Sequence, residues 1–537
     1  MLSSHLMTPP SMRVDPAAEP SPTISPLWRL ILFCSVIALL YGLGIFWGLP
    51  SILSPATDSP APLSPLNWIA RYRDTSVSYI YPPVHQLLCL AAYGVVLLGW
   101  KLAGGIGAIS KAYPYGFHSP TLIFSSLLLV TNLLSLAMGL GILVCMRSFR
   151  LARRASAWYA MFLLGVSGVF AYYARVGNLD VPYMFWVVLS WLLVWRHIFS
   201  KPDRKLVVLA AIAGALAIGT KDQAVGVEFG LGLVLLFVSP EGPLHTIRVR
   251  IKAAFWFGCT LFLTYAVTAI AVNPWRWWAH MTYRMVVPDP EYPATVWGQW
   301  HVFLRSVERT SNILSPGGLL LGVLGFVLLL RTGALRKSAV LFIPPAAYYV
   351  SVIMVSRWIE ERYLLPAAFA LALCAGFAAS EFLNWARHKR MARYVVLGFL
   401  AAILADQAIE GFLPVTYCQL LDVRRDLAKD LPSLIAEGAP LLMVRMNSFN
   451  IPDSRVYDRY RLMLPPEEKL TPPSSHGEHM LKPYDPQYRC VLAGSTLTRE
   501  AWPRVGRLVR EWTYPVWIKS RVHVPAVYEY SLYERGQ

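Results

Sequence analysis

Charged residues are scarce in this sequence. Asp, Glu, Lys and Arg make up 15% of its 537 residues, whereas soluble domains contain about 25%. The scarcity is confined to apolar runs of about 15 to 25 residues, and a run of that length can cross about 30 Å of hydrocarbon. The sequence therefore predicts an all-α polytopic membrane protein with about eleven transmembrane helices.

Motifs of soluble enzymes are missing as well. The sequence has no Walker A motif, G-x-G-x-x-G, H-E-x-x-H or G-x-S-x-G, so ATP-driven, dinucleotide-dependent, zinc-protease and hydrolase chemistry have no support. Nucleic-acid-binding motifs are absent, and the seven cysteines form no C-x-x-C pair. We therefore expect neither a nucleic-acid partner nor a structural zinc site, in spite of a net charge of +18.

The apolar runs are joined by connections that differ in charge. The runs fall at about 27–49, 120–146, 157–173, 181–199, 206–220, 224–239, 253–272, 314–330, 339–356, 363–382 and 394–412. Arg and Lys concentrate in every second connection, within 147–154, 196–205, 248–252, 331–337 and 387–393. The positive-inside rule makes these connections cytoplasmic. The chain is thus expected to be a multi-pass protein of the plasma (inner) membrane with a cytoplasmic N-terminus.

This alternation divides the chain into three parts. Residues 1–26 are rich in Pro and Ser and lack a signal-peptide pattern, which predicts a disordered cytoplasmic tail. The transmembrane domain spans 27–412. A small mixed α/β soluble domain is predicted at 413–537 on the extracytoplasmic side, where Cys418 and Cys490 could form a disulfide.

One further apolar run, at 83–100, does not fit the alternation. If it crossed the membrane, the basic connections would no longer share one side. We interpret it as an interfacial or re-entrant helix in a long first outer loop. The alternative is that residues 101–115 dip inward and a further crossing restores the order.

Several ionisable residues lie at the outer ends of the apolar runs, where a charge is costly unless it is paired, hydrated or used. Asp58 follows the first run and is either a functional acid or a solvated loop carboxylate. Asp180 begins an apolar helix. It could cap that helix, but Arg175 and Asn178 nearby favour a polar cluster.

Other outer segments combine polar and aromatic side chains. Lys221 and Asp222 interrupt two apolar runs, and a lysine there either binds a lipid phosphate or extends toward the headgroups. Tyr81 and His85 flank a Pro-Pro pair. His280 follows a Trp-rich stretch that is either an interfacial aromatic belt or a sugar-stacking surface.

A last outer segment is rich in both charges. Arg362 could bind a phosphate through a charge-assisted fork. Alternatively, Arg362 pairs with Glu360 and Arg357 pairs with Glu361, so that the charges neutralise one another.

Together these segments resemble the integral-membrane glycosyltransferases of the GT-C class, nearest to the branch of protein O-mannosyltransferases and aminoarabinose transferases. The matching stretches are Tyr81–His85, Arg175–Tyr183, Lys221–Gln223 and Arg362–Pro366. The donors of that branch are sugars linked to dolichyl or undecaprenyl phosphate. The resemblance implies a GT-C-like transmembrane catalytic domain with an extracytoplasmic active site.

The resemblance also implies roles for two acids. The family carries an acidic motif after its first helix, usually Asp-Glu, whose Asp is the base. Asp58 matches it, with Ser59 in place of Glu, and Asp74 is a rival. Asp180 matches the second outer acid. Some relatives use a divalent metal, which Asp58, Asp180 and His85 could share; no metal is assigned.

The implied reaction moves a sugar, with inversion, from a polyprenyl-phosphate sugar to a hydroxyl of a protein, lipid or glycan acceptor. Asp58 would remove the acceptor proton, while Lys221 and Arg362 stabilise the leaving phosphate. Asp180, with His85 or His280, would position the substrates. The alternatives are a transporter or lipid flippase without transferase activity, for which the expected internal repeats are not evident, and an inactive scaffold.

Overall fold

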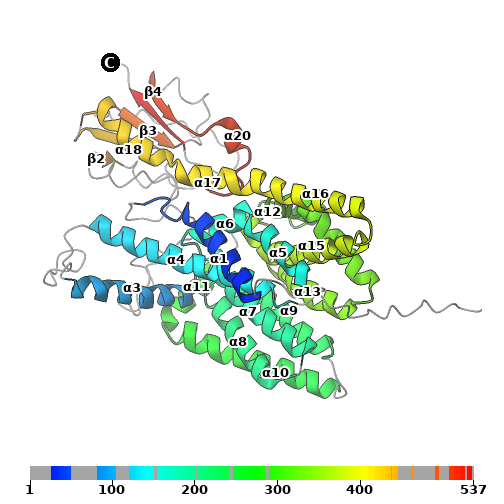
Figure 1. Ribbon diagram of the computed structural model, residues 1–537. Coiled ribbons are helices and arrows are strands. Elements are labelled where there is room, and N and C mark those ends of the chain that lie inside the picture. The colour runs from blue at the N-terminus through cyan, green and yellow to red at the C-terminus, as the bar shows by residue number, and fades with distance from the viewer. Residues whose placement is uncertain are drawn as a thin grey trace, which may run out of the picture.

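The protein is a bundle of helices with a small sheet at one end (Figure 1). The computed structural model describes residues 26–49, 81–103, 120–149, 151, 154–200, 202–240, 246–285, 290–436, 438–444, 461–463, 490–494, 507–525 and 529–534. Within these residues, eight helices are long and apolar enough to cross a membrane, or nine if one bent pair is a single span. The chain is therefore an integral, multi-pass membrane protein, and the predicted fold class is confirmed.

Each predicted apolar run contains a helix. The first half of the bundle comprises α1 (Pro26–Gly42), α3 (Val84–Leu102), α4 (Pro120–Met146), α5 (Arg154–Gly165), α6 (Gly168–Arg175), α7 (Asp180–Phe199), α8 (Arg204–Ile218) and α9 (Ala224–Phe237). The second half comprises α10 (Ile247–Tyr265) with η1 (Ala266–Ile270), α11 (Pro274–Met285), α12 (Val296–Arg331), α13 (Leu335–Tyr348) with η2 (Tyr349–Ile353) and α14 (Met354–Ser356), η3 (Glu361–Leu364), α15 (Leu365–Trp385) and α16 (Arg390–Gln407).

Two of these helical segments are sharply bent. The axes of α5 and α6 form an angle of 69°. In α12 the backbone breaks at Ser315, where φ is 54° and ψ is 161°. Pro316 follows directly, and proline disfavours helical geometry in the residue before it. The break separates the apolar part of α12, predicted at 314–330, from a more polar part toward its N-terminus.

The segment at 83–100 forms α3, which packs on α4. The Tyr93 hydroxyl lies 2.5 Å from the Thr131 hydroxyl, and Cys89 and Leu127 are buried beside this contact. By length and composition α3 could cross a membrane. Its interfacial or re-entrant placement therefore stays a prediction.

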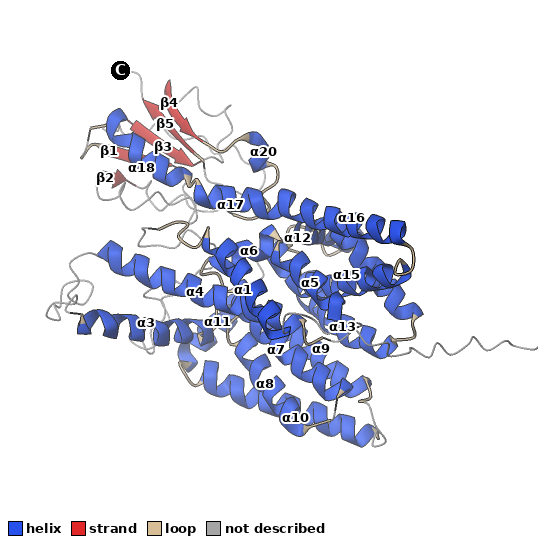
Figure 2. Cartoon of the chain, viewed as in Figure 1, coloured by secondary structure: helices blue, strands red, loops and turns tan. Residues whose placement is uncertain are grey.

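The C-terminal region forms a mixed sheet beside two helices (Figure 2). The helical chain of α16 continues through η4 (Ala408–Phe412) into α17 (Leu413–Leu420), and α18 (Val423–Leu434) follows. The strand order is β2-β1-β3-β5-β4. The strands are β1 (Pro440–Val444), β2 (Arg461–Met463), β3 (Cys490–Gly494), β4 (Arg507–Trp512) and β5 (Tyr530–Glu534), with α20 (Val516–Lys519) after β4. Strand β1 pairs in parallel with β2 and β3, and β5 pairs antiparallel with β3 and β4.

This region is attached firmly to the bundle. The Tyr514 hydroxyl donates to the Cys418 carbonyl at 2.9 Å, and the Tyr172 hydroxyl of α6 donates to the Pro525 carbonyl at 3.2 Å. The disulfide considered for Cys418 and Cys490 is not formed, because both are free thiols. Cys418 is buried in α17, whereas Cys490 begins β3.

Candidate functional site

Three segments distant in sequence bring charged side chains together at one end of the bundle. Asp180 is the first residue of α7, Lys221 lies in the turn between α8 and α9, and Arg362 lies in η3 just before α15. The Lys221 ammonium is 2.5 Å from Asp180 Oδ1, and the Arg362 guanidinium is 3.8 Å from Asp180 Oδ2. We call these three residues the ionic cluster.

The ionic cluster is withdrawn from solvent. The side chains of Asp180 and Lys221 have no exposed surface, and that of Arg362 is 6% exposed. Transfer of ions from water to such surroundings is costly, and only mutual attraction and hydrogen bonds offset the cost. The stability of each buried ion therefore depends on the other two. A bound anion would interact strongly with Lys221 and Arg362.

Local sequence explains how Asp180 comes to face Lys221. The Asn178 side-chain oxygen accepts a hydrogen bond from the Asp180 backbone N–H at 2.6 Å, so Asn178 satisfies part of the helix N-terminus. The residue at the N-cap, Leu179, makes no side-chain capping bond. The capping role considered for the Asp180 side chain is thus wrong, and its carboxylate serves the ionic cluster.

Three tyrosine rings surround the Lys221 ammonium. Its nitrogen lies 5.4 Å from the ring centre of Tyr81, 5.6 Å from that of Tyr183 and 5.3 Å from that of Tyr363. At these distances the rings attract the cation and restrict its movement. Tyr81 is among the sequence candidates. Tyr183 and Tyr363 are not, although they lie within three residues of Asp180 and Arg362.

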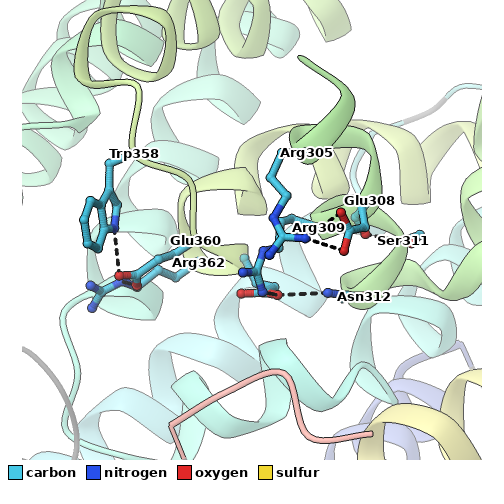
Figure 3. A network of polar contacts seen from close by, with 9 residues as sticks. Arg305, Glu308, Arg309, Ser311, Asn312, Trp358, Glu360 and Arg362 are labelled. Atoms are coloured by element: carbon cyan, nitrogen blue, oxygen red, sulfur yellow. Dashed lines mark hydrogen bonds and ion pairs between the residues drawn. The ribbon is translucent and has the colours of Figure 1, made fainter. Parts of the chain in front are cut away.

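The segment before α15 is anchored by the two acidic residues that precede Arg362 (Figure 3). Arg362 Nε lies 2.6 Å from Glu360 Oε2, and the Trp358 indole donates to Glu360 Oε1 at 3.0 Å. Glu361 accepts hydrogen bonds from Arg309 and, at 2.9 Å, from the Asn312 amide. The Arg362 side chain is therefore held between Glu360 and Asp180.

Of the two ion pairs considered from the sequence for this segment, the structure contains one. The Arg362–Glu360 pair exists, together with the contact to Asp180. The Arg357–Glu361 pair is wrong, since Glu361 pairs with Arg309. The Arg357 backbone is left-handed, with φ of 54°, and its guanidinium donates to the Tyr292 carbonyl at 3.0 Å.

Asp222, which follows Lys221 in the chain, forms a second polar pair with His280 of α11. His280 Nε2 lies 2.7 Å from Asp222 Oδ2, with the imidazole buried and the carboxylate 30% exposed. His280 comes from α11, so the pair ties this helix to the α8–α9 turn. Trp275 and Trp278 of α11 are exposed, as an interfacial aromatic belt requires.

Two candidates point to other parts of the molecule. The Arg175 guanidinium is fully buried and donates to the Thr416 hydroxyl of α17 at 3.0 Å. His85 is buried in α3, with Nε2 3.5 Å from the Cys89 sulfur. Among the described residues, the hydrogen bonds of Arg175 and His85 do not involve the ionic cluster.

Among the residues predicted as the base or as metal ligands, the structure describes Asp180 and His85. Asp58 and Asp74 lie outside the described residues. Over the part of the chain that is described, no group of three or more His, Cys, Asp or Glu side chains could hold a metal ion. Asp180 is engaged by Lys221 and Arg362, and His85 lies beside Cys89, so these two residues do not fit a shared metal.

No protein-family model matches the chain. An uncharacterized protein of Aquifex aeolicus is 29% identical over 119 residues, which are 21% of this chain and only 23% of the relative's length. ArnT from Cupriavidus metallidurans, in the apo state, aligns over 95% of this chain and 98% of its own, with a TM-score of 0.47 and 14% identity. The oligosaccharyltransferase of Archaeoglobus fulgidus aligns over 81% and 62%, with a TM-score of 0.44 and 11% identity.

Proposed function

We propose that the chain is a membrane glycosyltransferase. It would move a sugar from a polyprenyl-phosphate sugar to a hydroxyl group of a protein, lipid or glycan acceptor, with inversion at the anomeric carbon. The observation that carries this proposal is the ionic cluster, in which two buried cations and one carboxylate meet beside three tyrosine rings. The matching sequence stretches contribute all six of these side chains.

The position of the cluster supports an extracytoplasmic reaction. Asp180 and Arg362 lie where α7 and α15 begin, and Lys221 lies where α8 ends. The basic stretches 196–205 and 387–393 lie at the opposite ends of these helices, which the positive-inside rule assigns to the cytoplasm. The donor would therefore be a lipid-linked sugar in the outer leaflet, which requires no nucleotide site.

The chemistry of the leaving group suits the two cations. A sugar phosphodiester carries one negative charge, and the polyprenyl phosphate released from it gains further negative charge. Lys221 and Arg362 would stabilise this developing charge more strongly than the charge of the donor, which is the condition for catalysis. Asp180 is better placed to hold the two cations than to remove a proton, because one carboxylate oxygen is occupied by Lys221.

Proton removal from the acceptor is assigned to Asp58 in this proposal. Its support is the sequence motif after the first helix, where a carboxylate acts as general base in the family that the chain resembles. Asp74 is the alternative base. Asp222 and His280 would contribute to substrate binding at the same end of the bundle.

The experiment measures sugar transfer from a radiolabelled polyprenyl-phosphate sugar in membranes containing the wild-type chain, Asp58→Asn or Asp180→Asn. We expect transfer by the wild type and loss of transfer in both variants at normal expression. Glu308→Gln, on an exposed part of α12, is the matched control and should remain active.

The rival functions give different results. A transporter or flippase would move the lipid-linked sugar across proteoliposome membranes without forming a product, and an inactive scaffold would do neither. Equal transfer by the wild type and both Asp variants would reject the roles of Asp58 and Asp180. A screen of donor lipids by mass spectrometry would identify the sugar.

A further inference from the structure

Glu228 is a carboxyl group inside the bundle that the proposed reaction does not use. It lies in α9, is 2% exposed, and accepts a hydrogen bond from the Ser190 hydroxyl of α7 at 2.8 Å. Its other carboxyl oxygen, Oε1, has no hydrogen-bond partner. Among the described residues, no ion pair reaches Glu228.

Small residues on two sides of α9 make this arrangement close-fitting. A Cβ atom at Gly214 of α8 would overlap the Glu228 carboxyl group. On the other face of α9, a Cβ at Gly230 would lie 2.5 Å from Pro344 Cα, and one at Gly226 would lie 2.9 Å from Tyr348 Cα. Helix α9 is thus fixed between α7, α8 and α13, with little freedom to shift.

The surroundings of Glu228 determine its charge. An ionised carboxylate with one hydroxyl partner, buried among membrane-spanning helices, would lack both the solvation and the counter-ion that it requires. A neutral carboxylic acid has a much smaller desolvation cost, and it still accepts the bond from Ser190. The neutral acid is therefore the form that this site stabilises.

The Ser190–Glu228 bond joins α7, which begins at Asp180, to α9, which begins three residues after Lys221. Ser190 follows Asp180 by ten residues on α7, a rise of about 15 Å, and Glu228 follows Ala224, the first residue of α9, by four residues, a rise of about 6 Å. Helix α7 is thus bonded to the turn before α9 through Lys221 and to α9 itself through Glu228. A shift of α9 along α7 would break the inner bond and move Lys221 away from Asp180.

We propose that Glu228 is a positioning residue, kept as a neutral carboxylic acid, which fixes the register of α9 against α7 and so the contact of Lys221 with Asp180. Its effect on catalysis rests on the proposed function, whereas its protonation state does not. Infrared difference spectra of the wild type minus Glu228→Gln test the protonation state without any transfer assay. We expect a carboxylic-acid C=O band that shifts in D₂O; carboxylate bands in its place would overturn the neutral-acid assignment.

The positioning role is tested by transfer rate per folded molecule, with folded protein quantified by gel filtration in detergent. Glu228→Gln keeps a neutral acceptor for Ser190 and should retain nearly all the wild-type kcat. Glu228→Ala should lower kcat roughly 10- to 100-fold, since small misplacements of reacting groups have effects of that size. Leu235→Ala, a buried truncation farther along α9, should leave kcat nearly unchanged.

The outcomes separate the possibilities. Equal kcat values for Glu228→Ala and Leu235→Ala would overturn the positioning role, as would a kcat of Glu228→Gln as low as that of Glu228→Ala. If the wild type transfers no sugar, the proposed function fails. The infrared result and a loss of thermal stability in Glu228→Ala, rescued in Glu228→Gln, then still decide the structural part of the inference.

Discussion

Two groups of ionised side chains in the bundle have similar geometry and different surroundings. In the ionic cluster, Lys221 and Asp180 are 2.5 Å apart and fully buried. On α12, Arg305 and Glu308 are also 2.5 Å apart, but their side chains are 32% and 56% exposed. Water and salt screen the second pair and not the first. The distance between two charges therefore says little about their importance until their burial is known.

The largest expected effect comes from removal of the buried carboxylate. Asp180→Ala leaves Lys221 buried without its counter-ion, which should destabilise the protein by about 3–5 kcal/mol. Thermal unfolding in detergent measures this loss. The double variant Asp180→Asn/Lys221→Met should recover most of the stability and none of the transfer activity. Failure of the double variant to recover stability would contradict this electrostatic account.

The next effect concerns the shape of the second cation. Arg362→Lys keeps the positive charge but loses the fork that reaches both Glu360 and Asp180. We expect kcat to fall roughly 100-fold or more, as for loss of one donor to a developing anion. The donor KM should change less than kcat. An unchanged kcat would show that Arg362 does not contact the reacting phosphate.

A smaller effect is expected where the exposed and buried groups meet. Glu361 lies between the two groups, because it precedes Arg362 in the chain and pairs with Arg309, which follows Glu308 on α12. Glu361→Gln keeps the hydrogen bond from Asn312 in part and weakens the bond to Arg309, at a cost of about 1–2 kcal/mol. We expect a moderate fall in kcat. Asn312→Ala, measured in parallel, should have the same direction and a smaller size.

The smallest effect should follow removal of the exposed pair. Arg305→Ala and Glu308→Ala should each change the unfolding free energy by less than about 1 kcal/mol. Transfer should stay near the wild-type rate. Thermal unfolding at low and high salt checks this, and the small difference should vanish at high salt. A loss as large as that of Asp180→Ala would contradict the comparison of the two groups.

The sequence was sufficient to predict the helices, because apolar runs of this length mark membrane-embedded segments. It did not predict the 69° bend between α5 and α6 within the run 157–173. Through the family resemblance it assigned Asp180, Lys221 and Arg362 to one reaction, but it did not predict the contacts of Asp180 with the two cations. It did not predict that Arg175 contacts α17, because α6 ends at Arg175 and an irregular segment precedes α7. Side chains only five positions apart can then face different partners.

The sequence alone marks Glu228 as unusual, although Glu228 is not among the predicted site residues. It lies within the apolar run 224–239, where a single acid is expensive and therefore informative. The tyrosine rings around Lys221 are a different case. Tyr81, Tyr183 and Tyr363 come from three distant segments, and hydropathy does not record which rings converge. Only the packing of these segments in the folded protein brings them together.

The uninterrupted helical path from α16 through η4 into α17 has a mechanical consequence. Helix α16, η4 and α17 follow one another without a break up to Leu420, so helical phase sets the direction in which the chain leaves the bundle there. One residue inserted into α16 would turn it by about 100°, whereas seven would nearly restore the phase and lift it by about 10 Å. The length of α16 thus sets both the height at which α17 ends and the direction in which it points.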